Sequence, residues 1–197
     1  MTARWKVLVI STFALGASVM APAQQRTRPS APAPTTAQLT QTLLTGMVRI
    51  LNELPTDGKV GTSRIVRLMH GRQLADREDK AAHDAFRALY KNKVNFNVAT
   101  IGAFDRNGKP QRFTVAAWTD GIDAYDLKAP LMTLAQEVHR NRKPVSERTI
   151  NSKSVKTMVS ARPVFARREC LSCHAGAKAG DVVGVALVTW RPNAPRR

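Results

Sequence analysis

Hydrophobic residues in the first half of the chain recur at the spacing of amphipathic helices. Leucine, methionine and isoleucine recur at three- and four-residue steps over residues 37–54, which predicts a helix with one buried face. Thr36 is placed to cap this helix and Pro55 to end it. A second helical pattern runs over residues 63–92, with Gly71 as a candidate interruption.

The pattern then changes to that of strands. Two segments rich in β-branched and aromatic residues, 94–104 and 111–119, flank an Asn107-Gly108 pair, and this arrangement predicts a β-hairpin. Three further elements follow: a helix over 126–142, a second hairpin with strands over 145–150 and 154–165, and an apolar strand over 181–190. The order predicts an α+β fold with a five-stranded antiparallel sheet of the PAS or Cache kind, preceded by N-terminal helices.

The ends of the chain have a different character. Residues 1–23 have the features of an export signal: a basic start at Arg4 and Lys6, an apolar run, and small residues for cleavage. The alternative is an uncleaved N-terminal membrane anchor, because the run is near the lower limit of about 17 residues that can span a bilayer. Residues 24–36 are predicted to be a flexible linker, residues 37–191 the folded domain and residues 192–197 a basic tail. Either reading of the signal predicts a periplasmic domain.

Charge narrows the range of partners. The formal net charge is +17 at pH 7, and removal of the signal lowers it by only two. Nucleic acid is not expected as a partner, because the protein is exported and its basic residues are spread along the chain instead of forming one arm. An acidic redox partner protein or an anionic membrane surface fits better, and a solvated basic surface without a dedicated partner is the simpler alternative.

The candidate chemistry lies at Cys170-Leu171-Ser172-Cys173-His174, which contains the only two cysteines in the chain. At this spacing two thiols can add across the two vinyl groups of one haem while the adjacent imidazole reaches the iron. The motif therefore predicts one covalently bound haem c, with Cys170 and Cys173 as attachment points and His174 as an axial ligand.

Three other roles compete for the cysteine pair. A structural zinc site needs four ligands, and the remaining histidines are scattered singly along the chain. A redox-active dithiol is expected at a helix start in a βαβ unit, which the predicted element order does not supply. A plain structural disulfide is the third alternative. Haem attachment is favoured because chance would rarely place a histidine directly after two cysteines at this spacing, and because it agrees with export.

Residues 145–190 resemble a family of single-haem c-type domains of unknown function with a PAS-like fold, found free in the periplasm or as sensory parts of receptors. The shared features are Pro163-Val164 at a strand end, the cysteine motif, Gly180-Asp181, and Gly184-Val185 in the last strand. The resemblance implies a haem held against the sheet, His174 as one axial ligand, and N-terminal helices packed over the ring.

The sequence leaves the second axial ligand open. His70 and its neighbour Met69 are the leading candidates, since such domains take this ligand from an N-terminal helix. The wider set is Met47, Met69, His70, His83, Met132, His139 and Met158, and an empty sixth position is a further alternative. Arg162, Arg167 and Arg168 flank the motif and are candidates to pair with the haem propionates.

These features predict a periplasmic monohaem c-type cytochrome that carries single electrons and is not an enzyme. The main alternative is a haem-based redox or gas sensor, a ligand-binding module that acts through a separate partner because the chain has no kinase or methyl-accepting segment. A peroxidase is a minor alternative, since it would need an open distal site with a base or an arginine beside it.

Overall fold

The structure is a computed structural model that describes residues 32–52, 61–71, 77–105, 107–119, 122–152, 155–172, 174 and 176–191. The predicted signal over 1–23, most of the linker over 24–36, Cys173 and the basic tail over 192–197 lie outside the described residues. The described residues from Pro34 onward form one compact unit.

The first helix, α1, spans Thr36–Asn52 and begins with a capping box. The amide of Gln38 donates to Oγ1 of Thr35, and the amide of Thr35 donates to Oε1 of Gln38. The capping residue is therefore Thr35 and not Thr36 as predicted, because only Thr35 has a glutamine three positions later. Leu43, Leu44 and other apolar residues of α1 are buried on one face, as their spacing predicts.

The second helical pattern forms two helices instead of one. Helix α2 spans Gly61–Met69 and helix α3 spans Arg77–Lys91. Gly71 follows α2 with a φ of +67°, a left-handed conformation that glycine adopts without a steric penalty. The predicted interruption at Gly71 is therefore confirmed.

The five strands and the fourth helix follow the predicted order. The sheet consists of β1 (Phe96–Phe104), β2 (Pro110–Trp118), β3 (Val145–Ser152), β4 (Val155–Phe165) and β5 (Val182–Trp190), and α4 (Lys128–Asn141) connects β2 to β3. All neighbouring strands are antiparallel, in the spatial order β2-β1-β5-β4-β3. This confirms an α+β fold with a five-stranded antiparallel sheet.

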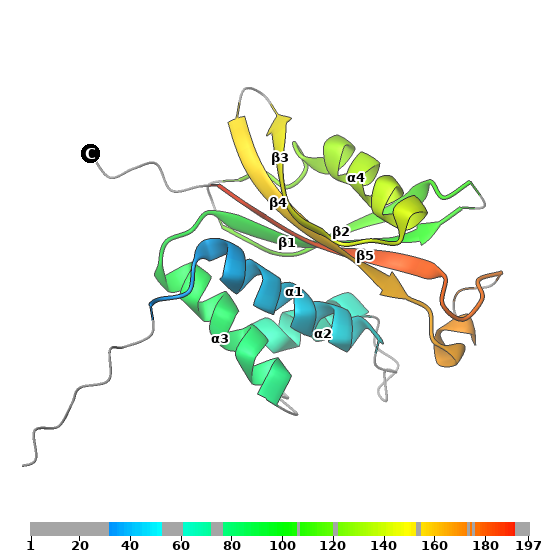
Figure 1. Ribbon diagram of the computed structural model, residues 1–197, viewed down its shortest axis with the longest axis horizontal. Helices are drawn as coiled ribbons and strands as arrows, with labels where there is room; N and C mark the ends of the chain where they lie inside the picture. Colours follow the sequence, from blue (N-terminus) through cyan, green and yellow to red (C-terminus); the bar gives the residue numbers. More distant parts are fainter. Residues whose placement is uncertain are drawn as a thin grey trace, which may run out of the picture. The chain divides into compact units, whose positions relative to one another are not determined.

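Helices cover both faces of the sheet (Figure 1). Helices α1, α2 and α3 pack on one face, against buried residues such as Val98 and Val188. Helix α4 packs on the other face, against residues such as Ile101 and Leu187. Alternate residues of β1 and β5 therefore enter opposite cores, because successive side chains of a strand point to opposite faces.

Candidate functional site

The cysteine motif lies in the loop between β4 and β5, at one end of the sheet (Figure 1). Two hydrogen bonds join the ends of this loop: the amide of Ala166 donates to the carbonyl of Asp181 at 2.7 Å, and the amide of Gly180 donates to the carbonyl of Ala166 at 2.7 Å. Arg142, at the end of α4, also donates from Nη2 to the carbonyl of Gly180. The loop therefore leaves and re-enters the sheet at a fixed position.

Within the loop, a 3₁₀ helix over Arg168–Ser172 carries the first cysteine. The amide of His174 donates to the carbonyl of Cys170 at 3.0 Å, which turns the chain back over the cysteine. Cys170 is half-buried and is not in a disulfide, and its Sγ lies 3.4 Å from the donating amide of Arg167. The local hydrogen bonds thus hold Cys170 and His174 on the same compact turn.

Cys170 and His174 line a cavity of about 300 Å³ on the face of the sheet that carries α1. Its floor is formed by a row of residues paired directly across four strands: Arg112 on β2, Gly102 on β1, Gly184 on β5 and Val164 on β4. Leu51, near the end of α1, lines it as well. The cavity therefore extends across the sheet from β4 to the edge strand β2.

The two glycines in this row keep the middle of the floor flat. Neither has a positive φ, so the backbone does not require glycine at either position. A Cβ at Gly102 would meet nothing closer than the carbonyl oxygen of Val183, at 3.6 Å. A Cβ at Gly184 would lie 3.4 Å from the carbonyl oxygen of Ile101, which is a close but feasible contact. Glycine within a strand often marks a place where a ligand approaches the backbone closely.

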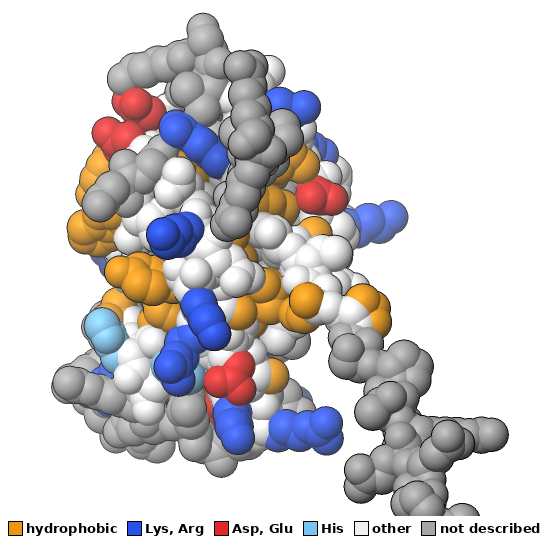
Figure 2. Space-filling model, turned by 90° about the vertical axis from the view of Figure 1, so that its left-hand side faces the viewer, with side chains coloured by type: hydrophobic (Ala, Val, Ile, Leu, Met, Phe, Trp, Pro, Cys, Tyr) orange, Lys and Arg blue, Asp and Glu red, His pale blue; other side chains and the backbone are white. Residues whose placement is uncertain are grey.

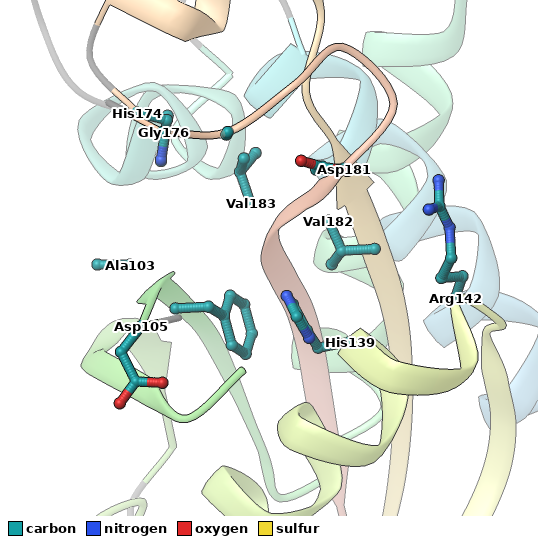
Figure 3. Close-up of a pocket in the computed structure, with 11 residues that line it drawn as sticks. Ala103, Asp105, His139, Arg142, His174, Gly176, Asp181, Val182 and Val183 are labelled. Atoms are coloured by element: carbon teal, nitrogen blue, oxygen red, sulfur yellow. The ribbon is translucent and has the colours of Figure 1, made fainter. Parts of the chain in front are cut away.

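A larger cavity of about 730 Å³ adjoins the first one. Ala103, His174 and Val183 line both cavities, and His139 of α4 lines the larger one. Figure 3 shows His174 pointing into this space from the motif loop and His139 pointing into it from the opposite side. The larger cavity therefore gives a second approach to His174.

His139 is held by packing more than by hydrogen bonds. Its ring stacks on Phe104 with centroids 4.3 Å apart, and its Nδ1 is buried without a hydrogen-bond partner among the described residues. Burial lowers the pKa of His139 and the nearby Arg142 lowers it further, while Asp181 opposes this shift. The neutral imidazole is therefore favoured in the folded protein.

The predicted second axial ligands are dispersed through the fold. His70 is exposed, and the side chain of Met69 belongs to the core under α1 and α3. Of the wider set, Met47 is also in that core, Met132 packs against the α4 core, Met158 accepts a hydrogen bond from Thr149, and His83 bonds the carbonyl of Leu68 through Nδ1. Among these candidates, only His139 shares a described cavity with His174.

The arginines predicted to pair with propionates do not line the smaller cavity. Arg162 is half-buried and donates from Nη2 to Oε1 of Gln41 on α1, and Arg167 and Arg168 are exposed. The charged side chain that does line it is Arg112, which sequence reasoning missed. The cavity floor could have been predicted from Gly102 and Gly184, because an isolated glycine within an apolar strand suggests a close approach to the backbone.

Charged side chains are visible on one face of the molecule in Figure 2. On this face, several Lys and Arg side chains lie close together in the lower part beside an acidic side chain, and others lie separately above them. No group of three or more His, Cys, Asp or Glu suited to a metal ion occurs in the part of the chain that the structure describes. None of the described helices has both the length and the apolar character needed to cross a membrane.

Comparison of the chain with protein-family models, with curated proteins and with solved structures found no match.

Proposed function

We propose that this protein is a periplasmic monohaem c-type cytochrome that carries single electrons on a haem attached to Cys170 and Cys173. The observation that supports this most directly is the flat floor formed by Gly102 and Gly184 beside Cys170 and His174. A planar cofactor needs such a floor, and residues of the attachment motif line the same cavity.

The residues present fit a haem. Cys170 and His174 border one cavity, as a thioether and an axial ligand of the same ring require. The cavity spans four strands, and three strand intervals of about 4.8 Å give a width of about 14 Å. The two adjoining cavities have volumes within the range of about 300 to 1,000 Å³ that is usual for cofactor and ligand sites.

Attachment of the haem to the cysteines is an addition reaction that needs no oxidant or reductant. Each cysteine thiol adds across one vinyl group, so that a C–S bond forms, the C=C bond becomes single, and the thiol hydrogen passes to the other vinyl carbon. When bound, haem supplies an iron that takes up and releases one electron. His174 would hold that iron through a ring nitrogen, and the apolar side chains of Leu51 and Val164 would help to exclude water from the ring.

The fold is consistent with this proposal. The strand order β2-β1-β5-β4-β3 is that of PAS-like sheets, to which the resembling haem domains belong. The net charge of +17 favours an acidic redox partner or an anionic membrane surface over a basic one. The N-terminal signal pattern supports export to the compartment where c-type haem is attached.

A second candidate function is a haem-based redox or gas sensor that acts through a separate partner. The larger cavity favours it, because about 730 Å³ of space adjoins His174 and is lined by side chains from β1, α4 and the motif loop. In a sensor, a ligand or a change of ligation in this space would move the loop against the sheet.

The test is to express the full-length chain in cells with working c-type haem attachment machinery. We expect a coloured protein whose haem stays bound in acid acetone, and a Cys170→Ala, Cys173→Ala double variant that loses all its haem under the same treatment. A colourless full-length protein would refute the proposal. Rapid carbon monoxide binding by the reduced protein would favour the sensor over the carrier.

A further inference from the structure

We infer that Arg112 binds the propionate carboxylates of the haem and thereby fixes the orientation of the ring in its cavity. The inference rests on the proposed function and assigns a role to a residue that lines the cavity from the edge strand β2.

The position of Arg112 follows from the strand register. Arg112 pairs with Gly102, Gly102 pairs with Gly184, and Gly184 pairs with Val164, so the four residues form one row on one face of the sheet. Val164 ends this row on β4, the strand that leads into the motif loop, and Arg112 ends it on β2, the edge strand. Only the two glycines lie between them.

The positions of the vinyl and propionate groups on haem also favour a propionate site on the β2 side of the cavity. The vinyl groups and the propionates lie on opposite edges of the porphyrin, so a ring attached at Cys170 directs its propionates away from the motif. Across the glycine row, that direction leads to Arg112. Carboxylates need charge-assisted hydrogen bonds or water, and an arginine offers paired N–H donors in the geometry of a carboxylate.

Arg112 is available for this role. Its side chain is exposed, and it has no ion pair with a described residue. The described residues that line the cavity include no carboxylate, whereas Thr100 and Thr114, the next pair along β1 and β2, add hydroxyl groups beside it. The cavity thus has a basic, polar end at β2 and an apolar middle. In contrast, Arg162 is engaged with Gln41.

The experiment compares haem-loaded wild-type protein with Arg112→Gln, Arg112→Lys and a control, Arg87→Gln. Arg87 is an exposed arginine of α3, so its replacement removes the same charge at a position that does not border the cavity. The reduction potential is measured between pH 4 and pH 9, and the propionate modes are recorded by resonance Raman spectroscopy.

We expect Arg112→Gln to lower the potential at pH 7, since loss of a nearby cation favours the ferric state. We also expect it to raise the pKa of the propionate step by about one unit and to shift the propionate modes. Arg112→Lys should retain part of both effects, and Arg87→Gln should match the wild type. A pH profile and Raman spectrum of Arg112→Gln that superimpose on those of Arg87→Gln would overturn the inference. Absence of bound haem in the wild type would instead refute the proposed function.

Discussion

Gly102 and Gly184 lie directly opposite each other on β1 and β5, in the middle of the sheet and on the face that carries α1. A glycine pair weakens a sheet, because each glycine loses more conformational entropy on folding than alanine and contributes no side chain to packing. The backbone conformation does not require either glycine. The glycine pair therefore lowers the stability of the sheet and leaves an open cavity floor beside Cys170 and His174.

Filling this floor should separate stability from cofactor binding. In Gly102→Ala, a Cβ has room, so we expect the apoprotein to gain about 0.5 kcal/mol in free energy of unfolding from reduced chain entropy. In Gly102→Val, the larger side chain projects into the cavity, and we expect the haem content per protein to fall at least several-fold. Urea unfolding of the apoprotein and haem absorbance per protein measure the two effects. Full haem content in Gly102→Val would show that the floor formed by the two glycines is not part of the haem site.

The buried carboxylate of Asp79 should be important for packing of α1 against α3. Asp79 is 3% exposed and forms an ion pair with Arg49 of α1. Removing the buried carboxylate breaks its ion pair with Arg49, so Asp79→Ala should cost about 3 kcal/mol in free energy of unfolding. The half-exposed pair between Arg148 and Glu137 is the matched control, and Arg148→Ala should cost no more than about 1 kcal/mol. Equal costs in urea unfolding would contradict this.

His139 should make stability depend on pH. Because burial lowers its pKa in the folded state, the unfolded chain binds more protons at pH values between the folded pKa and the ordinary value of 6.5. The free energy of unfolding should therefore fall as the pH is lowered from about 7 through this window, and the contribution of His139 should be constant above it. His139→Phe, which preserves a ring over Phe104, should reduce the slope. An unchanged slope in chemical denaturation at pH 5 to 7.5 would refute the assignment.

Gly108 and His139 should be coupled energetically. Gly108, in the β1–β2 turn, has a φ of +71°, and a Cβ there would lie 2.8 Å from Nδ1 of His139. Gly108→Ala should therefore cost about 1 to 2 kcal/mol from backbone strain alone, with the steric clash in addition. In the His139→Ala background the clash disappears and only the strain should remain. A double-mutant cycle measures the difference, and strict additivity would contradict a direct contact.

Local patterns predicted most of the elements, since they depend on neighbours in the chain. The Asn107-Gly108 turn, the helix ended near Arg142 and the apolar strand before Trp190 all follow from residues within a few positions of each other. The site depends instead on register between strands distant in sequence. Arg112 and Val164 lie in one row only because β5 separates β1 from β4 by a single strand, and no local pattern specifies that alignment.

The central position of β5 also orders the assembly of the sheet. The β1–β2 and β3–β4 hairpins can each close locally, but in the described sheet they are not neighbours, and both pair with β5. Residues 182–190, which form β5, must therefore pair with β1 and β4 before the two hairpins become one sheet. Until then the motif loop lacks the two hydrogen bonds that join Ala166 to Gly180 and Asp181. Docking of β5 is therefore the step that closes the motif loop.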